Sequence, residues 1–144
     1  MSKEKHLEFI QGIITRMNTN SFQIKGLTIT IASALIAIYA STKKIEFIFI
    51  GIIPAIFFWF LDAYYLQQER KFRGVYNDVA GITTINIVKE FEMPIHKYKK
   101  GKYCYFNVFK SKTIIWFYLS IIIILLISGF ILCKNTGFYI LNCK

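Results

Sequence analysis

Residues 113–133 restrict the fold more than any other segment: they are twenty-one consecutive residues without a charged side chain, and include the run IIIILL. At about 1.5 Å of rise per residue, a helix of this length crosses a hydrocarbon core about 30 Å thick. A helix can do so because all of its backbone hydrogen bonds are formed within the segment itself. The segment therefore predicts a transmembrane helix.

Two further apolar runs precede it. Residues 26–42 carry no charge, and residues 45–67 carry only two acidic side chains. Lys43 and Lys44 predict a tight turn between these runs, and Pro54 predicts a kink or a local loss of backbone hydrogen bonding in the second one. Hydrophobic residues make up 55% of the 144-residue chain, more than a water-soluble fold of this length can bury. We therefore expect an all-α membrane protein with three transmembrane helices.

The distribution of Lys and Arg predicts the orientation. The segment up to residue 25 contains four such residues and residues 62–112 contain ten, whereas residues 43–46 and 134–144 contain two each. Three spans place the first two of these segments on one side of the membrane and the last two on the other. Because basic residues favour the cytoplasmic side, we expect the N-terminus inside and the C-terminus outside a cytoplasmic membrane.

Residues 1–25 predict an amphipathic helix on the cytoplasmic side. Leu7, Ile10 and Ile14 recur at helical spacing, whereas Arg16 and other polar residues occupy the opposite side. A signal peptide would place its apolar run closer to the N-terminus and end in a cleavage motif of small residues. We therefore expect this helix to be retained in the protein.

Residues 68–112 are predicted to form a basic cytoplasmic region between the transmembrane hairpin of residues 26–67 and the third span. A helix extends out of the second span, and Gly81 is expected to end it. Beyond it, β-branched and aromatic residues alternate, and the sequence KKGK at 99–102 predicts a possible short β-hairpin. Residues 134–144 are expected to form a short outer tail.

Small and hydroxyl-bearing residues recur along the first span, and five of them are candidates for lining a pore or packing against another helix: Thr30, Ser33, Ala34, Ala37 and Ser41. Such residues let helices approach closely, and hydroxyls can bond across an interface or line a wet path. One interpretation is packing against the other two spans of the same chain. The other is an oligomer whose first spans surround a pore, because three helices alone cannot enclose a wide channel.

Basic and aromatic residues gather in the cytoplasmic region, and the candidate ligand-binding residues are Arg70, Arg73, Lys97, Lys99, Lys100, Lys102, Tyr103, Tyr105, Lys110 and Lys112. Lysines can hold phosphates while aromatic rings stack on bases, which suits a nucleotide or single-stranded nucleic acid. The alternative is a polybasic segment that lies on anionic lipid headgroups. From the residues alone, the lipid interpretation is the stronger one.

Asp62 lies at the inner end of the second span. A carboxylate in a membrane costs free energy unless it is paired or hydrated. We expect a structural ion pair with Arg16, Lys25 or Arg70, in preference to a functional role.

Catalytic and metal-binding signatures are absent from the sequence. It contains no nucleophile motif, no phosphate-binding glycine loop and no convincing pair of carboxylates. His6 and His96 are far apart, and Cys104, Cys133 and Cys143 do not have the CxxC spacing of a zinc site. We therefore expect a protein that is not an enzyme and that holds no metal and no cofactor.

Two stretches resemble a known family: residues 6–26, HLEFIQGIITRMNTNSFQIKG, and residues 57–79, FFWFLDAYYLQQERKFRGVYNDV. They are similar to the small transmembrane effectors of bacterial anti-phage systems that encode a nucleotidyltransferase, of the Hailong type. The resemblance implies an oligomeric ion channel in the bacterial inner membrane that depolarises an infected cell. It also implies a regulator, a short single-stranded DNA oligomer made by the partner enzyme, which holds the channel shut.

Three functions remain in competition. The first is a homo-oligomeric gated pore, with four copies as the working number, whose cytoplasmic basic region binds an anionic nucleotide or DNA oligomer. Opening of this pore would depolarise the membrane and arrest growth. The second is a non-conducting membrane scaffold that recruits a soluble partner. The third is a holin-like toxin that damages membranes without a ligand.

Overall fold

The computed structural model describes residues 2–84 and 86–141, with side chains described up to Ile131. Its helices, in chain order, are α1 (Ser2–Thr42), α2 (Glu46–Ala80), the 3-10 helices η1 (Ile95–Lys97) and η2 (Gly101–Tyr103), α3 (Tyr105–Phe109) and α4 (Lys112–Leu141). These described ranges contain no β-strand. The expectation of an all-helical architecture is confirmed.

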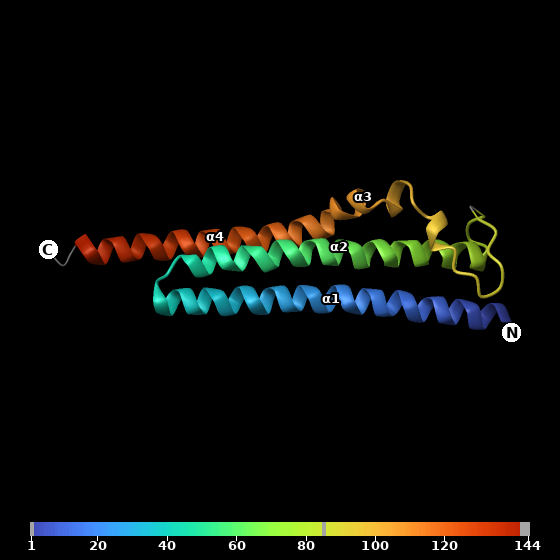
Figure 1. Ribbon diagram of the computed structural model, residues 1–144, viewed down its shortest axis with the longest axis horizontal. Coiled ribbons are helices and arrows are strands. Elements are labelled where there is room, and N and C mark those ends of the chain that lie inside the picture. Colours follow the sequence, from blue (N-terminus) through green and yellow to red (C-terminus); the bar gives the residue numbers. More distant parts are fainter. Residues whose placement is uncertain (1, 85, 142–144) are drawn as a thin grey trace.

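The long helices α1 and α2 form an antiparallel hairpin, and α4 lies alongside one half of it and projects beyond the turn between them (Figure 1). At 41 residues, α1 is about 60 Å long, twice the thickness of a hydrocarbon core. Nothing in the sequence interrupts it near residue 25, since Gly26 is tolerated within a helix. The amphipathic segment and the first span, predicted as separate units, are therefore one continuous helix.

Local signals fix both ends of α2. The predicted turn at Lys43 and Lys44 is confirmed: Lys43 adopts a φ of 58°, and its amide donates to the carbonyl of Tyr39. The predicted stop at Gly81 is also confirmed, with a φ of 85° and an amide that donates to the carbonyls of the last helical turn. Glycine adopts this left-handed conformation without steric cost, which is why it commonly ends helices.

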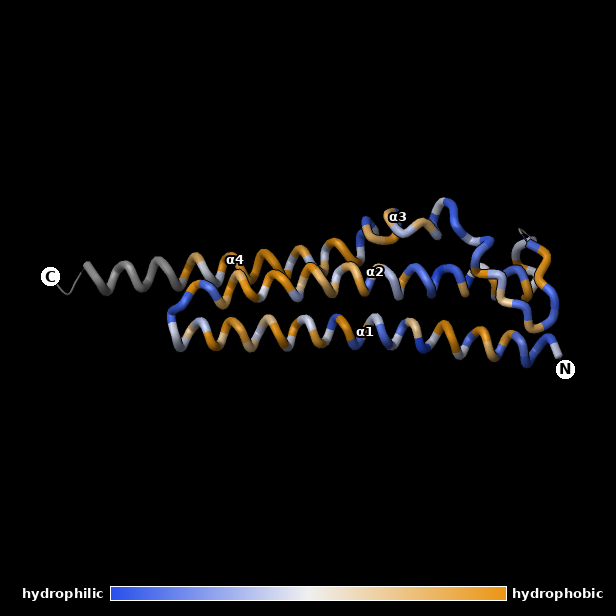
Figure 2. Tube along the Cα trace, viewed as in Figure 1, coloured by the Kyte–Doolittle hydropathy of each residue, from blue (hydrophilic) through white to orange (hydrophobic). Residues whose placement is uncertain are grey.

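Three helices are long and apolar enough to cross a membrane, judged over the described residues: Ser2–Thr42, Glu46–Ala80 and Lys112–Ile131. Figure 2 shows that their hydrophobic residues gather where α4 lies alongside the hairpin. We call this half, residues 26–42, 46–61 and 113–131, the apolar bundle. The other half, residues 2–24 and 63–111, is the polar stalk.

Small residues allow the apolar bundle to pack closely. Its buried core consists of Ala32, Tyr39, Ile48, Ala55, Ile121 and Leu125, contributed by α1, α2 and α4. A Cβ added at Gly51 of α2 would lie 3.2 Å from Leu35 of α1 and 3.4 Å from Leu125 of α4. Gly51 therefore lies where all three helices meet, and a larger residue there would separate them.

Two expectations need correction. One concerns the tail after the third span, and the other concerns the hairpin in the cytoplasmic region. The helical backbone of α4 continues to Leu141, so most of the expected outer tail of residues 134–144 is helix. The expected hairpin at 99–102 is replaced by η2, with Gly101 at a φ of 62°. The described residues of the segment 81–111 form hydrogen bonds within the segment and with side chains of α1 and α2, and none with a paired strand.

Candidate functional site

Gly74 of α2 allows the connecting segment, residues 81–111, to lie directly on the stalk. An added Cβ at Gly74 would lie 2.7 Å from the ring of Tyr98 and 2.8 Å from the hydroxyl of Tyr103. The two tyrosine rings meet edge to face, with centroids 5.3 Å apart, and both are buried against Ile10, Ile14 and Val75. The absence of a side chain at Gly74 thus makes room for both rings.

Asp78, one helical turn beyond Gly74, joins this segment to α2 by hydrogen bonds. Its carboxylate accepts bonds from the hydroxyl of Tyr98 at 2.5 Å, from the hydroxyl of Thr83, and from the backbone amide of Asn86 at 3.1 Å. Burial raises the pKa of Tyr98 above its usual value, and the hydrogen bond to Asp78 raises it further. The phenol therefore stays protonated as a donor, and the start of the connecting segment is fixed on α2.

A basic pocket of about 390 Å³ opens beside these tyrosines, and it is lined by Asn86, Lys97, Tyr98, Lys99, Lys100 and Tyr103. The three lysines are exposed, so their ammonium groups are hydrated and free to reorient. Three positive charges around one hollow attract phosphate or another multiply charged anion. We call this hollow, with Lys97, Lys99, Lys100, Tyr98 and Tyr103 around it, the basic pocket.

The two predicted ligand residues on α2 form hydrogen bonds and an ion pair with other residues of the same chain. Arg70 donates to the carbonyl of Lys102 and to the hydroxyl of Ser111, and Arg73 pairs with Glu69 at 2.8 Å. Lys102 lies next to the pocket, with its ammonium group 5.2 Å from the ring centroid of Tyr103. Arg70 therefore links Lys102, beside the basic pocket, to Ser111, the residue that precedes α4.

The other predicted ligand residues lie where the segment joins α4. The hydroxyl of Tyr105 donates to the carbonyl of Phe60, and burial raises the pKa of this tyrosine above its usual value. Lys110 and Lys112 are exposed beside it. The ten candidates thus lie in three places: beside or in the pocket within the segment, at its junction with α4, and on α2, which carries the arginines.

His6 holds the connecting segment on α1. Its imidazole is buried, and its Nδ1 accepts a hydrogen bond from the amide of Phe91 at 3.3 Å. Phe91 has a φ of 57°, unusual for a residue with a side chain, and its ring lies 5.4 Å from the imidazole. Ser2 adds a hydrogen bond to the carboxylate of Glu90. The segment therefore bridges both helices of the stalk.

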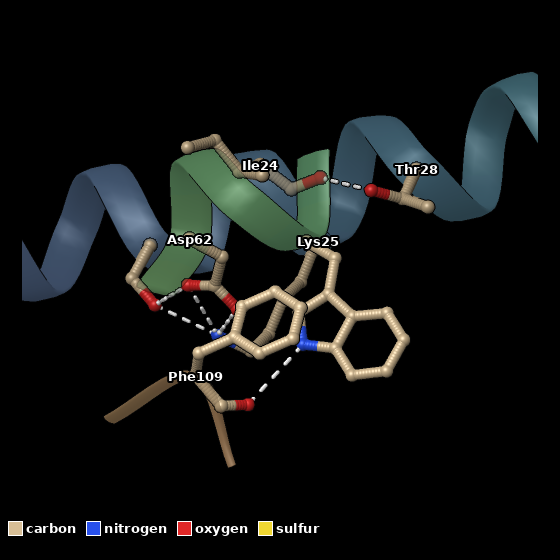
Figure 3. A network of polar contacts seen from close by, with 7 residues as sticks. Ile24, Lys25, Thr28, Asp62 and Phe109 are labelled. Atoms are coloured by element: carbon tan, nitrogen blue, oxygen red, sulfur yellow. Dashed lines mark hydrogen bonds and ion pairs between the residues drawn. The ribbon is translucent and has the colours of Figure 1, made fainter. Parts of the chain in front are cut away.

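An ion pair lies at the boundary between the stalk and the apolar bundle (Figure 3). The carboxylate of Asp62 is fully buried, and its oxygens lie 2.9 Å and 2.6 Å from the ammonium group of Lys25. The hydroxyl of Ser21 also donates to this carboxylate. Of the three partners expected for Asp62, Lys25 is the one found, because it faces α2 at the same level.

The five candidate pore or packing residues of the first span, Thr30, Ser33, Ala34, Ala37 and Ser41, are all exposed on the single chain. The buried side of α1 instead carries Ile24, Thr28, Ala32 and Tyr39, which lie on the other side of the helix. The small-residue surface thus faces away from the hairpin. Within one chain these residues are not part of the interface with α2, and Ser33 lines a groove between α1 and α4. Packing against the other two spans of the same chain, one of the two interpretations, stays a prediction for α4.

Metal ligands do not gather anywhere in the described part of the chain: no group of three or more His, Cys, Asp or Glu could hold an ion. Cys104 is a free, half-buried thiol. The side chains of Cys133 and Cys143 lie outside the described residues.

Comparison with known proteins finds no family model, no curated protein and no solved structure that matches this chain. The resemblance in residues 6–26 and 57–79 therefore remains a hypothesis. Both stretches lie on the α1–α2 hairpin, where they supply the stalk core and the ion pair at the boundary.

Sequence reasoning missed the residues that shape the basic pocket. Gly74, Asp78 and Asn86 were not recognised, and His6 was considered only as a metal ligand. A polar residue near a helix end gives little signal, because its partners come from 5 to 20 residues further along the chain. The unusual glycine in the middle of a polar helix was the one available clue.

Proposed function

We propose that the protein is a homo-oligomeric pore of the bacterial inner membrane, gated by an anionic oligonucleotide, with its N-terminus in the cytoplasm. One observation carries the proposal: a continuous helix hairpin joins an apolar bundle that exposes small and hydroxyl-bearing residues to a stalk that bears a basic pocket. Such a hairpin can transmit a change at the pocket to the membrane, because helices are stiff along their axes.

The exposed surface of α1 supports the pore. Ser33, Ala37 and Ser41 lie on one side of the helix and do not pack against α2. Small residues favour close approach between helices in lipid, and hydroxyls tolerate water. A ring of copies, four as the working number, would bring these residues around an axis. A single chain could not enclose such a path.

The basic pocket supports an anionic regulator. Lys97, Lys99 and Lys100 can hold successive phosphates, whereas the burial of Tyr103 leaves only part of its ring for stacking on a base. Backbone recognition of this kind suits a short single-stranded DNA oligomer or a nucleotide. The resemblance to Hailong-type effectors adds the expected role, in which a partner nucleotidyltransferase makes the oligomer and loss of the oligomer opens the pore.

Conductance in planar bilayers tests the gating, measured with and without short single-stranded DNA oligomers. The purified protein should give discrete conductance that the oligomer changes. Replacing Lys97, Lys99 and Lys100 with Gln should abolish the effect of the oligomer but keep the conductance. Replacing Lys43 and Lys44 with Gln, at the other end of the hairpin, should leave the effect intact.

Two results would contradict the proposal. Conductance that ignores the oligomer in the unmodified protein would favour the holin-like toxin. A silent but well-assembled protein would favour the scaffold. The scaffold has one observation in its support, since Ile82, Ile87 and Phe91 are exposed on the polar stalk, where a soluble partner could cover them.

The assignment of the pore to α1 has its own test. Ala37→Leu should reduce single-channel conductance, because the larger side chain would narrow the path. Ile53→Leu is the control, since Ile53 is exposed on α2 of the apolar bundle and keeps its volume. Equal conductance in the two variants, with assembly unchanged, would remove α1 from the pore wall.

A further inference from the structure

His6 is a buried titratable residue that the proposed pore does not use. It is 2% exposed, and its Nδ1 accepts the amide hydrogen of Phe91, with 3.3 Å between the two nitrogens. The other ring nitrogen, Nε2, is buried and has no hydrogen-bond partner among the described residues. Because Nδ1 can accept a hydrogen bond only without a proton, this contact requires the neutral imidazole with its proton on Nε2.

A second proton on the imidazole would turn this contact from an attraction into a repulsion. The proton would go to Nδ1, so that two N–H groups would point at each other and neither could accept. Nε2 offers no compensation, since no carboxylate in the described part of the chain accepts a hydrogen bond from it. The bond between His6 and Phe91 therefore exists only in the neutral form of the imidazole.

The backbone at Phe91 depends on this contact. Its φ of 57° lies in the left-handed region, which is costly for a residue with a side chain and persists only where contacts hold it. The ring of Phe91 lies beside the imidazole but is 59% exposed, so its packing contributes little. The neighbouring bond from Ser2 to Glu90 is exposed and competes with hydration. The bond to His6 is therefore the main attachment of this turn to α1.

Charged and titratable side chains lie near His6 on three elements. Ile10 of α1 packs with Val75 and Val79 of α2, so His6, one turn before Ile10, lies near the level of the last turn of α2. The groups on these elements are Lys3, Glu4, Lys5 and Glu8 of α1, Lys89, Glu90 and Glu92 of the connecting segment, and Tyr76 and Asp78 of α2.

These groups belong to residue types that do not normally titrate between about pH 5.5 and pH 7, whereas histidine does. Carboxylates lose their protons below this range, and phenols and amines keep theirs throughout it. The chain has two histidines, and the other one, His96, is exposed. A response of the Phe91 turn to acid in this range is therefore expected from His6.

We propose that His6 is a pH-dependent switch, which holds the connecting segment on the N-terminal end of α1 while the imidazole is neutral and releases residues 87–93 when it is protonated. The attachment is present at the higher pH and is lost as the pH falls. This inference goes beyond the proposed pore and needs neither conduction nor binding of DNA. Acid should release only one end of the loop, because the amide of Asn86 is bonded to Asp78 and not to a histidine.

NMR of the full-length protein in detergent micelles tests the switch at about pH 7 and about pH 5.5. The nitrogen shifts of the His6 ring should show a proton on Nε2 alone at the higher pH and on both nitrogens at the lower. Hydrogen exchange of the Phe91 amide, corrected for its intrinsic dependence on pH, should become about tenfold faster or more as the bond is lost. The amide of Asn86 is the internal reference and should keep its protection.

His6→Asn separates titration from hydrogen bonding. The side-chain oxygen of Asn can take the place of Nδ1 as an acceptor but binds no proton, so the Phe91 amide should stay protected at both pH values. His6→Leu removes the acceptor, and the Phe91 amide should then exchange rapidly at both. His96→Asn is the matched control, because His96 is exposed, and it should keep the response of the unmodified protein.

Three results would overturn the inference. The first is a His6 ring that stays neutral down to about pH 5.5. The second is a ring that takes up its proton while the Phe91 amide keeps its protection. The third is a His6→Asn protein that still responds to acid, which would assign the response to a carboxylate. Failure of the conductance experiment leaves all three measurements unaffected, since none of them involves a pore or an oligonucleotide.

Discussion

The apolar bundle and the polar stalk are built on the same two helices but are held together differently. In the bundle, small residues such as Ala32, Ala55 and Gly51 bring the helices close, and much of the outer surface is apolar. In the stalk, the connecting segment attaches to both helices through hydrogen bonds to His6 and Asp78. In lipid, packing has to stabilise the helices, whereas in water directional bonds to a bridging segment can do so.

The boundary between the two halves has features of both. Lys25 and Asp62 are charged, as in the stalk, but Asp62 is as buried as the core of the bundle. Trp59 and Phe109 stack beside them, with ring centroids 4.8 Å apart. The pair therefore fixes the relative register of α1 and α2 at the level where the apolar bundle meets the polar stalk.

The largest effect is expected at this boundary. Lys25→Ala leaves a buried carboxylate without its counter-charge, which costs about 3–5 kcal/mol of the free energy of unfolding. Replacing both residues, Lys25 with Met and Asp62 with Leu, should restore most of that stability because no charge is then left unpaired. Unfolding by denaturant in detergent micelles measures both. If the double variant is as unstable as the single one, the unpaired charge is not the cause of the lost stability.

The next effect compares one chemical change in the two halves. Tyr98 and Tyr39 are both 2% exposed, and each donates one hydrogen bond. Tyr98→Phe loses a bond to a carboxylate, about 1.5–3 kcal/mol. Tyr39→Phe loses a bond to the carbonyl of Gly129 inside the bundle, where such bonds average about 0.6 kcal/mol. Hydrogen exchange and denaturant unfolding compare the two, and equal losses would contradict the difference drawn between the halves.

A smaller effect is expected from glycine replacements on the stalk. Gly74→Ala forces Tyr98 and Tyr103 to move and should cost about 1–3 kcal/mol of local stability. Gly12→Ala is the matched control, because an added Cβ at Gly12 has no neighbour within 4 Å. It should stabilise α1 by about 0.5–1 kcal/mol. Faster hydrogen exchange in residues 81–111 is expected only for Gly74→Ala, and its absence would show that the tyrosines tolerate displacement.

Elements that depend on local sequence were predictable. The uncharged run of residues 113–133, the turn at Lys43 and Lys44 and the stop at Gly81 each follow from residues close together in the chain. The prediction of a hairpin at residues 99–102 also relied on local sequence, and it was wrong. The local alternation of residues suggested a strand that the structure does not contain among its described residues. Tyr98 and Tyr103 are instead fixed by contacts with Gly74, more than twenty residues away.

The sequence identified the candidate basic residues but not how they are grouped in space. Their composition predicts an anion-binding region, because charge is a property of the residues themselves. The division into the basic pocket, the arginines used within the protein and the pair Lys110 and Lys112 depends on which side chains have partners. Partners of this kind are not encoded in spacing along the chain.

The sequence by itself determined that the chain contains three helices apolar and long enough for a membrane, because hydropathy and helix length are local sums over residues. Only the tertiary structure decided which faces of those helices are covered. It paired Lys25 with Asp62, left Ser33 and Ala37 exposed, and opened the groove between α1 and α4. The physical reason is that burial depends on the azimuth and axial register of packed helices, and these are set by contacts between residues far apart in the chain.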